Sequence, residues 1–594
     1  MHNTHTAHAC AFFRLSKLAL AMLVLFSATS ALAQQAPRIE QDPAQRLLQE
    51  QRDRERQRAL EQAPPQIIVP QPVQTLPADQ DVESLPDVAP TFQIEHVKLI
   101  GNTVLSEAEV SQIVAPFLGK RLGSNRLNLL LRRVTDAFVS RGLITTRAYL
   151  GEQNLGGGTL TLTVVPGTIE AIRLNGQLLS NAQGNVSPEK LQGGGWLTDR
   201  GVLWAMPTAP GDVLRLSNLE QGVEQINRLR RNRAEMQILP GTIPGSSIVG
   251  LTVQPSDPLW FNLGIDNYGT SQTGSTRTNA SVEADNLLGL QEMISASYSG
   301  SLDTNALVAS AALPIGYHTF SYTGAISEYQ TLISDTALIY GNTTGHTFGW
   351  NYVVARNQAA KTAFDMTLSR RKVERDINDL QIEPQRLTVL RIGVNTLRRF
   401  IYDGQQANWT VDGGLSRGLT AWNASRDSEA IQPSEAHSQF TKIDTTATSA
   451  LPLGSIGTSM WYWRAQLNAQ WSREALFGTE QIFAGGMSSV RGFQNGGISG
   501  DRGLTVRNDL SWVNAPEILG MHTEPYAFLD SGRTELIAEG RYRQVSSAGV
   551  GAKMQAAYGK HRFSSELLLG RPLVQPDYLG RKSTLLLASV NWSY

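Results

Sequence analysis

From about residue 257 to Tyr594, the chain is a succession of segments, each about ten residues long, in which polar and apolar side chains alternate. Two of them are "TNASVEADNLLG" (278–289) and "HTFGWNYVVARN" (346–357), and turns rich in Gly, Asn, Asp and Ser separate them. Alternation places one set of side chains on each face of a strand. A barrel with one face toward lipid and one toward water requires this pattern in many strands. Residues 256–594 are therefore predicted to form an antiparallel transmembrane β-barrel of roughly sixteen strands.

The last segment, "TLLLASVNWSY", indicates which face meets the lipid. One face carries apolar side chains: Leu586, Ala588, Val590, Trp592 and Tyr594. The other carries Ser589, Asn591 and Ser593. Aromatic rings gather at the membrane–water interface, so Trp592 and Tyr594 are predicted to anchor the C-terminus there. A soluble β-sandwich or propeller is the alternative, but the sequence has no repeated blade motif.

The N-terminus predicts export. Arg14 and Lys17 precede the apolar run "LALAMLVLF", and the small residues Ala31 and Ala33 follow it. This arrangement is typical of a secretory signal peptide, predicted over residues 1–33; the run is short for the alternative, a membrane anchor. The only cysteine, Cys10, lies in this segment, so we expect no disulfide in the mature chain. An exported chain without a later apolar run of about 20 residues is periplasmic, secreted or an outer-membrane barrel.

Two segments without a core pattern follow. Residues 34–62 include "QDPAQRLLQEQRDRERQRALEQ", which favours a helix, but its three leucines are too few for a buried stripe. Such a helix is either solvated at the surface or held inside a polar cavity. Residues 63–90 contain many prolines and are predicted to be an extended, mobile linker.

Residues 91–166 and 167–255 are predicted to be two copies of a small α/β module. In the first, a strand precedes two helices and two more strands, and Ser106 with Glu109 predicts a capping box. "RLNGQLLS" (173–180) resembles "LIGNTVLS" (99–106), and "GLTVQPS" near residue 253 resembles "TLTVVPG" near residue 163. Ser217 with Glu220 predicts a second capping box.

Composition and motifs argue against several functions. Lys+Arg and Asp+Glu both number 52, so net charge gives no reason to expect nucleic acid as a partner. The chain has no nucleophile elbow, zinc-binding helix motif or phosphate loop, and its mature histidines are isolated. A hydrolase embedded in the barrel, with Ser and His, has no motif to support it. We expect no catalytic residue, no cofactor and no metal site.

One charged residue stands out in a glycine-rich part of the barrel region. Arg491 lies in "SSVRGFQNGG", between Val490 and Gly492, and Phe493 follows. If this loop folds into the lumen, its guanidinium can form a bidentate pair with an acid on the inner wall. The candidates are Asp530 in "PYAFLDSGRT" and Asp509 in "VRNDLSW", and which of them pairs is left open. The alternative is an exposed loop arginine without a specific role.

The order of these features resembles the two-partner secretion transporters (TpsB family), of the haemolysin activator and filamentous haemagglutinin transporter type. The modules resemble POTRA domains, and "VRGF" (Val490, Arg491, Gly492 and Phe493) resembles the family signature on the sixth extracellular loop. "FLDSG" resembles the family's Phe-x-Asp-x-Gly strand motif, which marks Phe528, Asp530 and Gly532, and "GDRGLTVRNDL", with Asp509, resembles the strand before it. The final Tyr594 departs from the family's usual phenylalanine but keeps an aromatic ring.

The resemblance implies α+β periplasmic modules plus an all-β domain: two POTRA domains, then a 16-stranded barrel in the Gram-negative outer membrane. It implies that the 34–62 helix plugs the lumen. It also implies export, without nucleotide hydrolysis, of one large β-helical exoprotein: an adhesin, a haemolysin or a contact-dependent toxin. Outer-membrane lipids and the barrel-assembly machinery are further expected partners, and the chain is expected to be monomeric. The alternative is a factor that inserts other barrels, although such factors usually carry more POTRA domains.

Overall fold

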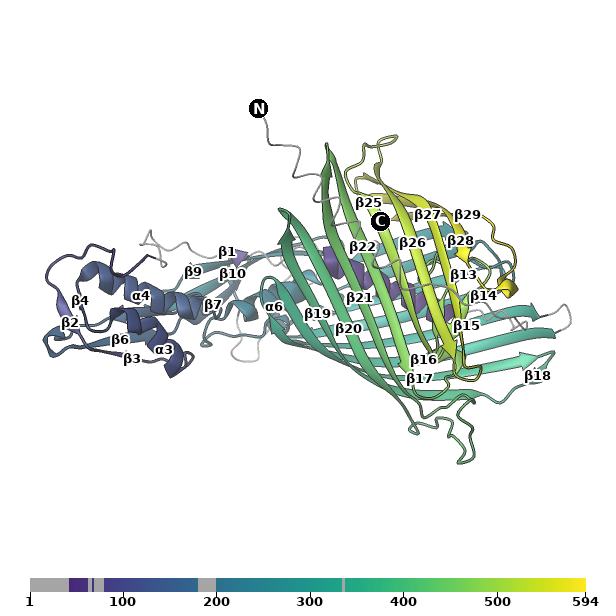
Figure 1. The fold of residues 1–594 in the computed structure, drawn as a ribbon, viewed down its shortest axis with the longest axis horizontal. Helices are drawn as coiled ribbons and strands as arrows, with labels where there is room; N and C mark the ends of the chain where they lie inside the picture. Colours follow the sequence, from purple (N-terminus) through teal and green to yellow (C-terminus); the bar gives the residue numbers. More distant parts are fainter. Residues whose placement is uncertain (1–41, 62–66, 69–79, 180–198, 334–336) are drawn as a thin grey trace.

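The computed structural model describes residues 42–61, 67–68, 80–179, 199–333 and 337–594 (Figure 1). The predicted signal peptide, residues 34–41 and most of the predicted linker lie outside these residues. Two small modules follow one another along the long axis of the molecule, and a large barrel completes it (Figure 1). A helix coloured purple lies within the barrel although it comes from the N-terminal part of the chain.

The barrel is closed, and its described residues form sixteen long antiparallel strands, which confirms the predicted number. The strands are β11 (Leu259–Asp266), β12 (Arg277–Asp285), β13 (Met293–Gly300), β14 (Thr304–Ile315), β15 (His318–Ile333), β16 (Ala337–Arg356), β17 (Ala360–Ile377), β19 (Gln385–Tyr402), β20 (Gln405–Leu419), β21 (Thr441–Ile456), β22 (Ser459–Ser472), β25 (Arg502–Trp512), β26 (His522–Leu536), β27 (Arg541–Tyr558), β28 (His561–Val574) and β29 (Leu585–Ser593). The two-residue β18 (Leu380–Gln381) pairs with β17. The first and last strands close the barrel through five residue pairs, from Asn262↔Ser593 to Asp266↔Ser589.

Side chains alternate across the barrel wall as the period-two pattern predicts. In β26, Tyr526, Phe528 and Asp530 are buried on the inner face, whereas Ala527 and Leu529 are exposed on the outer one. Closing a sheet removes its hydrogen-bonding edges, so every backbone polar group in the membrane can be paired. The wall is therefore a rigid frame that holds selected polar side chains toward the lumen.

The first module comprises β2 (Phe92–Ile94), β3 (His96–Ile100), α3 (Glu107–Val114), β4 (Lys120–Leu122), α4 (Ser124–Val139), β5 (Arg147–Leu150) and β6 (Thr159–Val165). Its three-stranded sheet has the order β3-β6-β5. The capping box at Ser106 and Glu109 forms as predicted. Residues 80–90, predicted to be part of a mobile linker, instead belong to this module, since Val82 and Leu85 are buried in its core. Asp87 adds to this, because its carboxylate accepts the backbone N–H groups of Gly123 and Asn125 at the start of α4.

The second module comprises β7 (Thr168–Leu174), β8 (Gln177–Leu178), α5 (Asp199–Ala205), α6 (Leu216–Asn227), β9 (Asn232–Pro240) and β10 (Ser246–Pro255). A two-residue strand from the linker, β1 (Ile67–Ile68), joins its sheet, whose order is β1-β9-β10-β7-β8. The predicted second capping box is wrong. Helix α6 has Arg215 as its N-cap residue, without a side-chain hydrogen bond, and Ser217 lies inside the helix. Glu220 instead lies 3.6 Å from Arg356 of the barrel.

The polar helix α2 (Pro43–Glu61) lies inside the barrel (Figure 1). Ala44 and Leu47 of this helix are buried in a small apolar cluster on the barrel wall, formed by Ala306, Val308 and Ala325 of β14 and β15. The helix therefore has a short apolar contact, although its leucines are too few to form a continuous buried face. One turn after Leu47, Glu50 pairs with Arg277 of β12 at 3.0 Å. Of the helices that the structure describes, none is both long and apolar enough to cross a membrane.

Candidate functional site

Residues 473–501, between β22 and β25, form a loop that is packed inside the barrel. Within it, β23 (Ile482–Ala484) pairs with β24 (Ile498–Gly500), so the glycine-rich stretch is the end of a small hairpin. Val490, Arg491 and Phe493 at this end are all buried. The alternative of an exposed loop arginine therefore does not hold.

Arg491 lies between both candidate acids. Its Nε donates to Asp530 Oδ2 at 2.7 Å and its Nη2 donates to Asp530 Oδ1 at 2.8 Å, a bidentate pair. The backbone N–H of Arg491 donates to the same carboxylate at 3.1 Å. Nη2 also donates to Asp509 Oδ1 on β25. We call Arg491, Asp509 and Asp530 the tip contact.

The tip contact is almost completely removed from water. Arg491 and Asp530 have side-chain exposures of 1% and 0%, whereas that of Asp509 is 14%. The guanidinium lies over the ring of Phe528, 4.1 Å from its centroid, a cation–π arrangement that compensates in part for lost hydration. A buried cation needs such hydrogen bonds and ion pairs, because its removal from water costs several kcal/mol.

Glycines and apolar residues create the room for the tip contact. Gly492 has a φ of +89°, a backbone conformation that other residues rarely adopt. A Cβ at Gly532 would lie 2.5 Å from Ala484 Cβ and 3.1 Å from Val490 Cγ2. The absence of a side chain at Gly532 therefore lets the loop pack directly against the backbone of the wall. Val490 and Phe493 pack in one apolar cluster, completed by Ala484, Ile498 and Val545.

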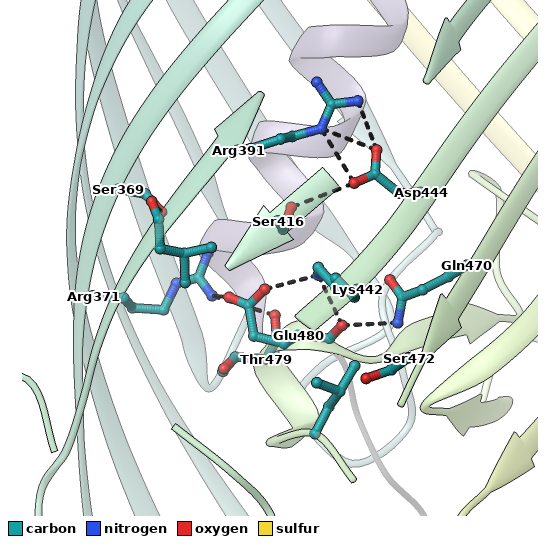
Figure 2. Close-up of polar contacts among 12 residues, drawn as sticks. Ser369, Arg371, Arg391, Ser416, Lys442, Asp444, Gln470, Ser472, Thr479 and Glu480 are labelled. Atoms are coloured by element: carbon teal, nitrogen blue, oxygen red, sulfur yellow. Dashed lines mark hydrogen bonds and ion pairs between the residues drawn. The ribbon is translucent and has the colours of Figure 1, made fainter. Parts of the chain in front are cut away.

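Sequence reasoning missed a second charged contact of the same loop, which Figure 2 shows. Glu480 Oε1 accepts from Arg371 Nη1 of β17 at 2.9 Å, and its Oε2 accepts from Lys442 Nζ of β21 at 2.8 Å. Gln470 Nε2 donates to the backbone carbonyl of Glu480 at 3.0 Å. We call Glu480, Arg371 and Lys442 the root contact. In the sequence, Glu480 is an isolated acid in "LFGTEQIFAGG", which indicates that it needs a cationic partner. The neighbouring residues do not identify Arg371 or Lys442 as that partner.

The root contact also reaches the helix in the lumen. Gln45 of α2 donates through Nε2 to the carbonyl of Thr479, and Arg371 donates to the same oxygen at 3.3 Å. Close by, Arg391 is held by Asp444 (Figure 2). Asp365 and Asp412 of neighbouring strands also pair with it. Helix, loop and wall therefore share one polar network.

The second module is fixed through α6 to turns between barrel strands. Glu224 pairs with Arg356 at 3.1 Å and with Lys361. Burial raises the pKa of Glu224, but Lys361 and Arg356 outweigh it and hold that pKa below its ordinary value. Gln221 and Gln225 donate to the carbonyl of Gly316 at 3.1 and 3.0 Å.

The two predicted anchor residues lie at the closing strands. Trp592 pairs with Leu263 of β11 and with Phe563 of β28, and its ring stacks with that of His561. The backbone of Tyr594 exchanges two hydrogen bonds with Phe261, at 2.9 and 3.0 Å. Both residues therefore help to close the barrel through their backbones, apart from any contact with lipid.

Comparison with known proteins identifies family models that match the barrel and both modules. Residues 245–554 match the model for haemolysin secretion/activation protein ShlB/FhaC/HecB. Residues 92–167 match the ShlB-type POTRA domain, and residues 168–240 match a further POTRA domain. The outer membrane transporter CdiB of Escherichia coli O6:K15:H31 (strain 536 / UPEC) is 31% identical over 94% of this chain and 90% of its own length.

Further relatives agree. The hemolysin transporter protein ShlB of Serratia marcescens is 29% identical over 74% of this chain and 75% of its own. The solved structure of CdiB from Escherichia coli covers 96% of this chain and 100% of its own, with a TM-score of 0.77 and 28% identity. CdiB from Acinetobacter baumannii, at 22% identity, shares the fold with a TM-score of 0.69 over 94% of this chain and 100% of its own. Two POTRA domains, a sixteen-stranded barrel and these matches together place the chain in the ShlB/FhaC/HecB family, as a two-partner secretion transporter of the outer membrane with its POTRA domains in the periplasm.

Proposed function

We propose that the chain exports one dedicated, large exoprotein through its barrel, after its POTRA domains have captured the unfolded client in the periplasm. The observation that carries this proposal is the occupied lumen: α2 and the inward-folded loop both lie in it, and both are held to the wall by polar contacts. Polar contacts can be exchanged for others without breaking the closed strand ladder of the wall. A rigid wall around removable elements is what a gated conduit requires.

The residues of the "VRGF" and "FLDSG" motifs hold the closed state in this proposal. Arg491 is the latch, and Asp530 with Asp509 is its receptor. Phe528 covers the guanidinium, and Gly492 and Gly532 let the loop come close to the wall. Trp592 and Tyr594 anchor the closing strand in the membrane. The predicted domain boundaries stay proposals, with the first POTRA domain extended to about residue 80 because Val82 and Leu85 belong to its core.

No chemical step is part of this mechanism. Export draws its free energy from the client, which folds outside the cell and cannot return. We propose that the chain is monomeric, lies among outer-membrane lipids and is inserted by the barrel-assembly machinery. Two relatives are named hemolysin transporters, and a haemolysin, an adhesin or a contact-dependent toxin is the class of client we propose.

A deletion strain tests this function. We expect one large exoprotein to stay in the periplasm, while the amounts of other outer-membrane barrels are unchanged. A general loss of barrels would instead identify an assembly factor. The most informative control is complementation with the wild-type chain, which restores export only if the retained exoprotein is its client.

A further inference from the structure

A girdle of aromatic side chains marks where the barrel leaves the membrane at its POTRA end. His318 and Phe320 lie on the outer face of β15, because Ala325 of the same strand faces α2 in the lumen and side chains alternate. Trp350 and Tyr352 lie beside them on β16, and the rings of His318 and Tyr352 stack with centroids 4.7 Å apart. Aromatic rings gather at the membrane–water interface. The membrane boundary at the POTRA end therefore lies at the start of β15.

Helix α6 of the second module reaches the barrel rim from the lumen side. Gln225 donates through Nε2 to the hydroxyl of Thr319 at 3.3 Å, and Thr319 faces the lumen because its neighbours on β15 face outward. Beyond the end of the helix, Arg230 pairs at 3.1 Å with Glu283 of β12, which lines the lumen cavity beside α2. These contacts leave the outer side of the rim to the other helix of the module, α5.

Helix α5 lies across the tips of two barrel turns. The carbonyl of Trp204 accepts the backbone N–H of Gly316 at 2.6 Å, and Gly316 follows Ile315, the last outward-facing residue of β14. Nearer the start of the helix, a Cβ at Gly201 would lie 2.1 Å from the carbonyl oxygen of Gly289, in the turn between β12 and β13. The absence of a side chain at Gly201 thus lets the helix rest directly on that turn.

The side chains that α5 exposes are suited to a membrane surface. Arg200 and Trp204 are both exposed and lie four residues apart, so they share one side of the helix. Trp204 has 38% of its surface exposed even though its carbonyl is bound beside the girdle. Tryptophan is enriched at the headgroup level of membranes, and arginine extends its charge toward the headgroups from an apolar stem. The pair is therefore typical of a helix that lies against a membrane.

The neighbouring turn adds apolar surface at the same rim. Leu287 and Leu288, between β12 and β13, are 43% and 66% exposed and directly precede Gly289, on which α5 rests. Large apolar side chains that are exposed next to one another indicate a contact surface. We call Arg200, Trp204, Leu287 and Leu288 the rim patch.

We propose that the rim patch lies in the headgroup region of the periplasmic leaflet, with phospholipid as its partner. The rim patch continues an existing lipid contact, because it begins where the lipid-facing strands and their aromatic girdle end. Arg200 binds a phospholipid phosphate, while Trp204 and the two leucines contact the first acyl carbons. The second module is then held on both sides of the rim, by polar contacts of α6 on the lumen side and by lipid under α5 on the outer side. The inference goes beyond the proposed export function, because it assigns a membrane contact to a POTRA domain, and it holds whatever the client is.

The test measures lipid contact of the full-length chain in phospholipid nanodiscs, without any client. Cys10, the only native cysteine, lies in the predicted signal peptide, so a single engineered cysteine can carry a fluorophore. Labels at Trp204→Cys and Leu288→Cys are exposed to two quenchers: a lipid with a nitroxide near the top of its acyl chain, and iodide in the water. We expect the nitroxide lipid to quench both labels roughly threefold more strongly than iodide does, because the rim patch lies at headgroup level.

Two further positions calibrate the quenching. Phe320→Cys, 46% exposed on the outer barrel wall, should be quenched by the nitroxide lipid. Ile243→Cys, 65% exposed in the turn between β9 and β10, should be quenched by iodide. If the labels at Trp204 and Leu288 behave like the label at Ile243, the rim patch meets water and the proposal is overturned. If neither quencher reaches them, protein covers the rim patch, and the proposal is overturned as well.

A second variant tests whether the turn and the helix act as one surface. Leu288→Glu places a carboxylate at the leaflet, so we expect nitroxide quenching of the label at Trp204 to fall about twofold. Ile100→Glu, at an exposed position of the first module, is the matched control and should leave that quenching unchanged. Unchanged quenching in Leu288→Glu would separate the turn from α5 and overturn the rim patch as a single contact. Neither experiment depends on secretion, so a failure of the proposed export function would leave its result intact.

Discussion

The tip contact and the root contact hold the same loop with opposite charges. At the tip, the loop supplies a cation, Arg491, to two wall anions; at the root, it supplies an anion, Glu480, to two wall cations. The tip lies on β25 and β26, next to the loop in the sequence, and the root lies on β17 and β21. The loop therefore ties strands on both sides of β22 together.

The difference between the two contacts is hydration. The side chains of Arg491 and Asp530 are at most 1% exposed, whereas Glu480, Lys442 and Arg371 are 10, 13 and 21% exposed. Removing one partner of a buried pair leaves an uncompensated charge and costs about 3–5 kcal/mol, and this cost falls where water reaches the remaining charge. The tip contact is thus expected to hold the loop firmly. The root contact, which also reaches the helix, is expected to break at a lower cost in free energy.

Arg491→Ala should have the largest effect. It leaves Asp530 fully buried without its cation, so we expect secretion to fall at least tenfold while the barrel still inserts. Secreted client and heat-modifiable barrel are measured in the same cells. Arg491→Lys, which keeps the charge but not the bidentate geometry, should be intermediate. Normal secretion by Arg491→Ala would remove the basis for a latch.

The two acids of the tip contact should differ. A double-mutant cycle with Arg491 should give a coupling of about 2–3 kcal/mol for Asp530 and about 1 kcal/mol for Asp509, from the free energy of loop release. Asp530 accepts three hydrogen bonds from Arg491 and is fully buried, whereas Asp509 accepts one. Loop release is measured by protease cleavage of the loop. Equal couplings would show that burial does not set the strength of the pair.

Glu480→Gln should have a smaller effect than any change at the tip. The amide keeps the shape but loses the charge that Arg371 and Lys442 share, so we expect the pore to open several-fold more often. Because the root is partly hydrated, high salt should weaken the wild-type root more than the tip. Glu429→Gln, on an exposed loop, is the control for charge alone. An effect as large as that of Arg491→Ala would reverse the comparison.

Gln45→Ala should have the smallest effect. It removes one hydrogen bond between α2 and Thr479, worth about 0.5 kcal/mol, so opening should rise about twofold. Gln51→Ala removes a contact to Glu55 within the helix itself and should not change conductance. The result to look for is additivity with Glu480→Gln: the two changes act on one network, so we expect their effects to be less than additive. Full additivity would separate the helix from the root contact.

The tip contact could be predicted because its residues lie in recognisable local sequence patterns. Period-two alternation put Phe528 and Asp530 on one face, and an arginine among glycines required a partner, so both acids could be named. The root contact could not be named in the same way. Its cations lie 109 and 38 residues before Glu480, and each is an ordinary lumen-facing residue on its strand. Likewise, Glu220 fitted the pattern of a capping box, but the barrel supplied Arg356 instead.

The sequence by itself therefore determined the barrel, the two modules, the polar helix and the loop with its arginine, because periodicity and glycine placement act over neighbouring residues. Only the tertiary structure decided that Arg491 contacts both acids, that Glu480 pairs with cations of β17 and β21, and that Ile67 and Ile68 pair with β9. Those choices depend on barrel closure and sheet order. Closure brings together strands far apart in the chain, and no local pattern records which side chains will then face one another.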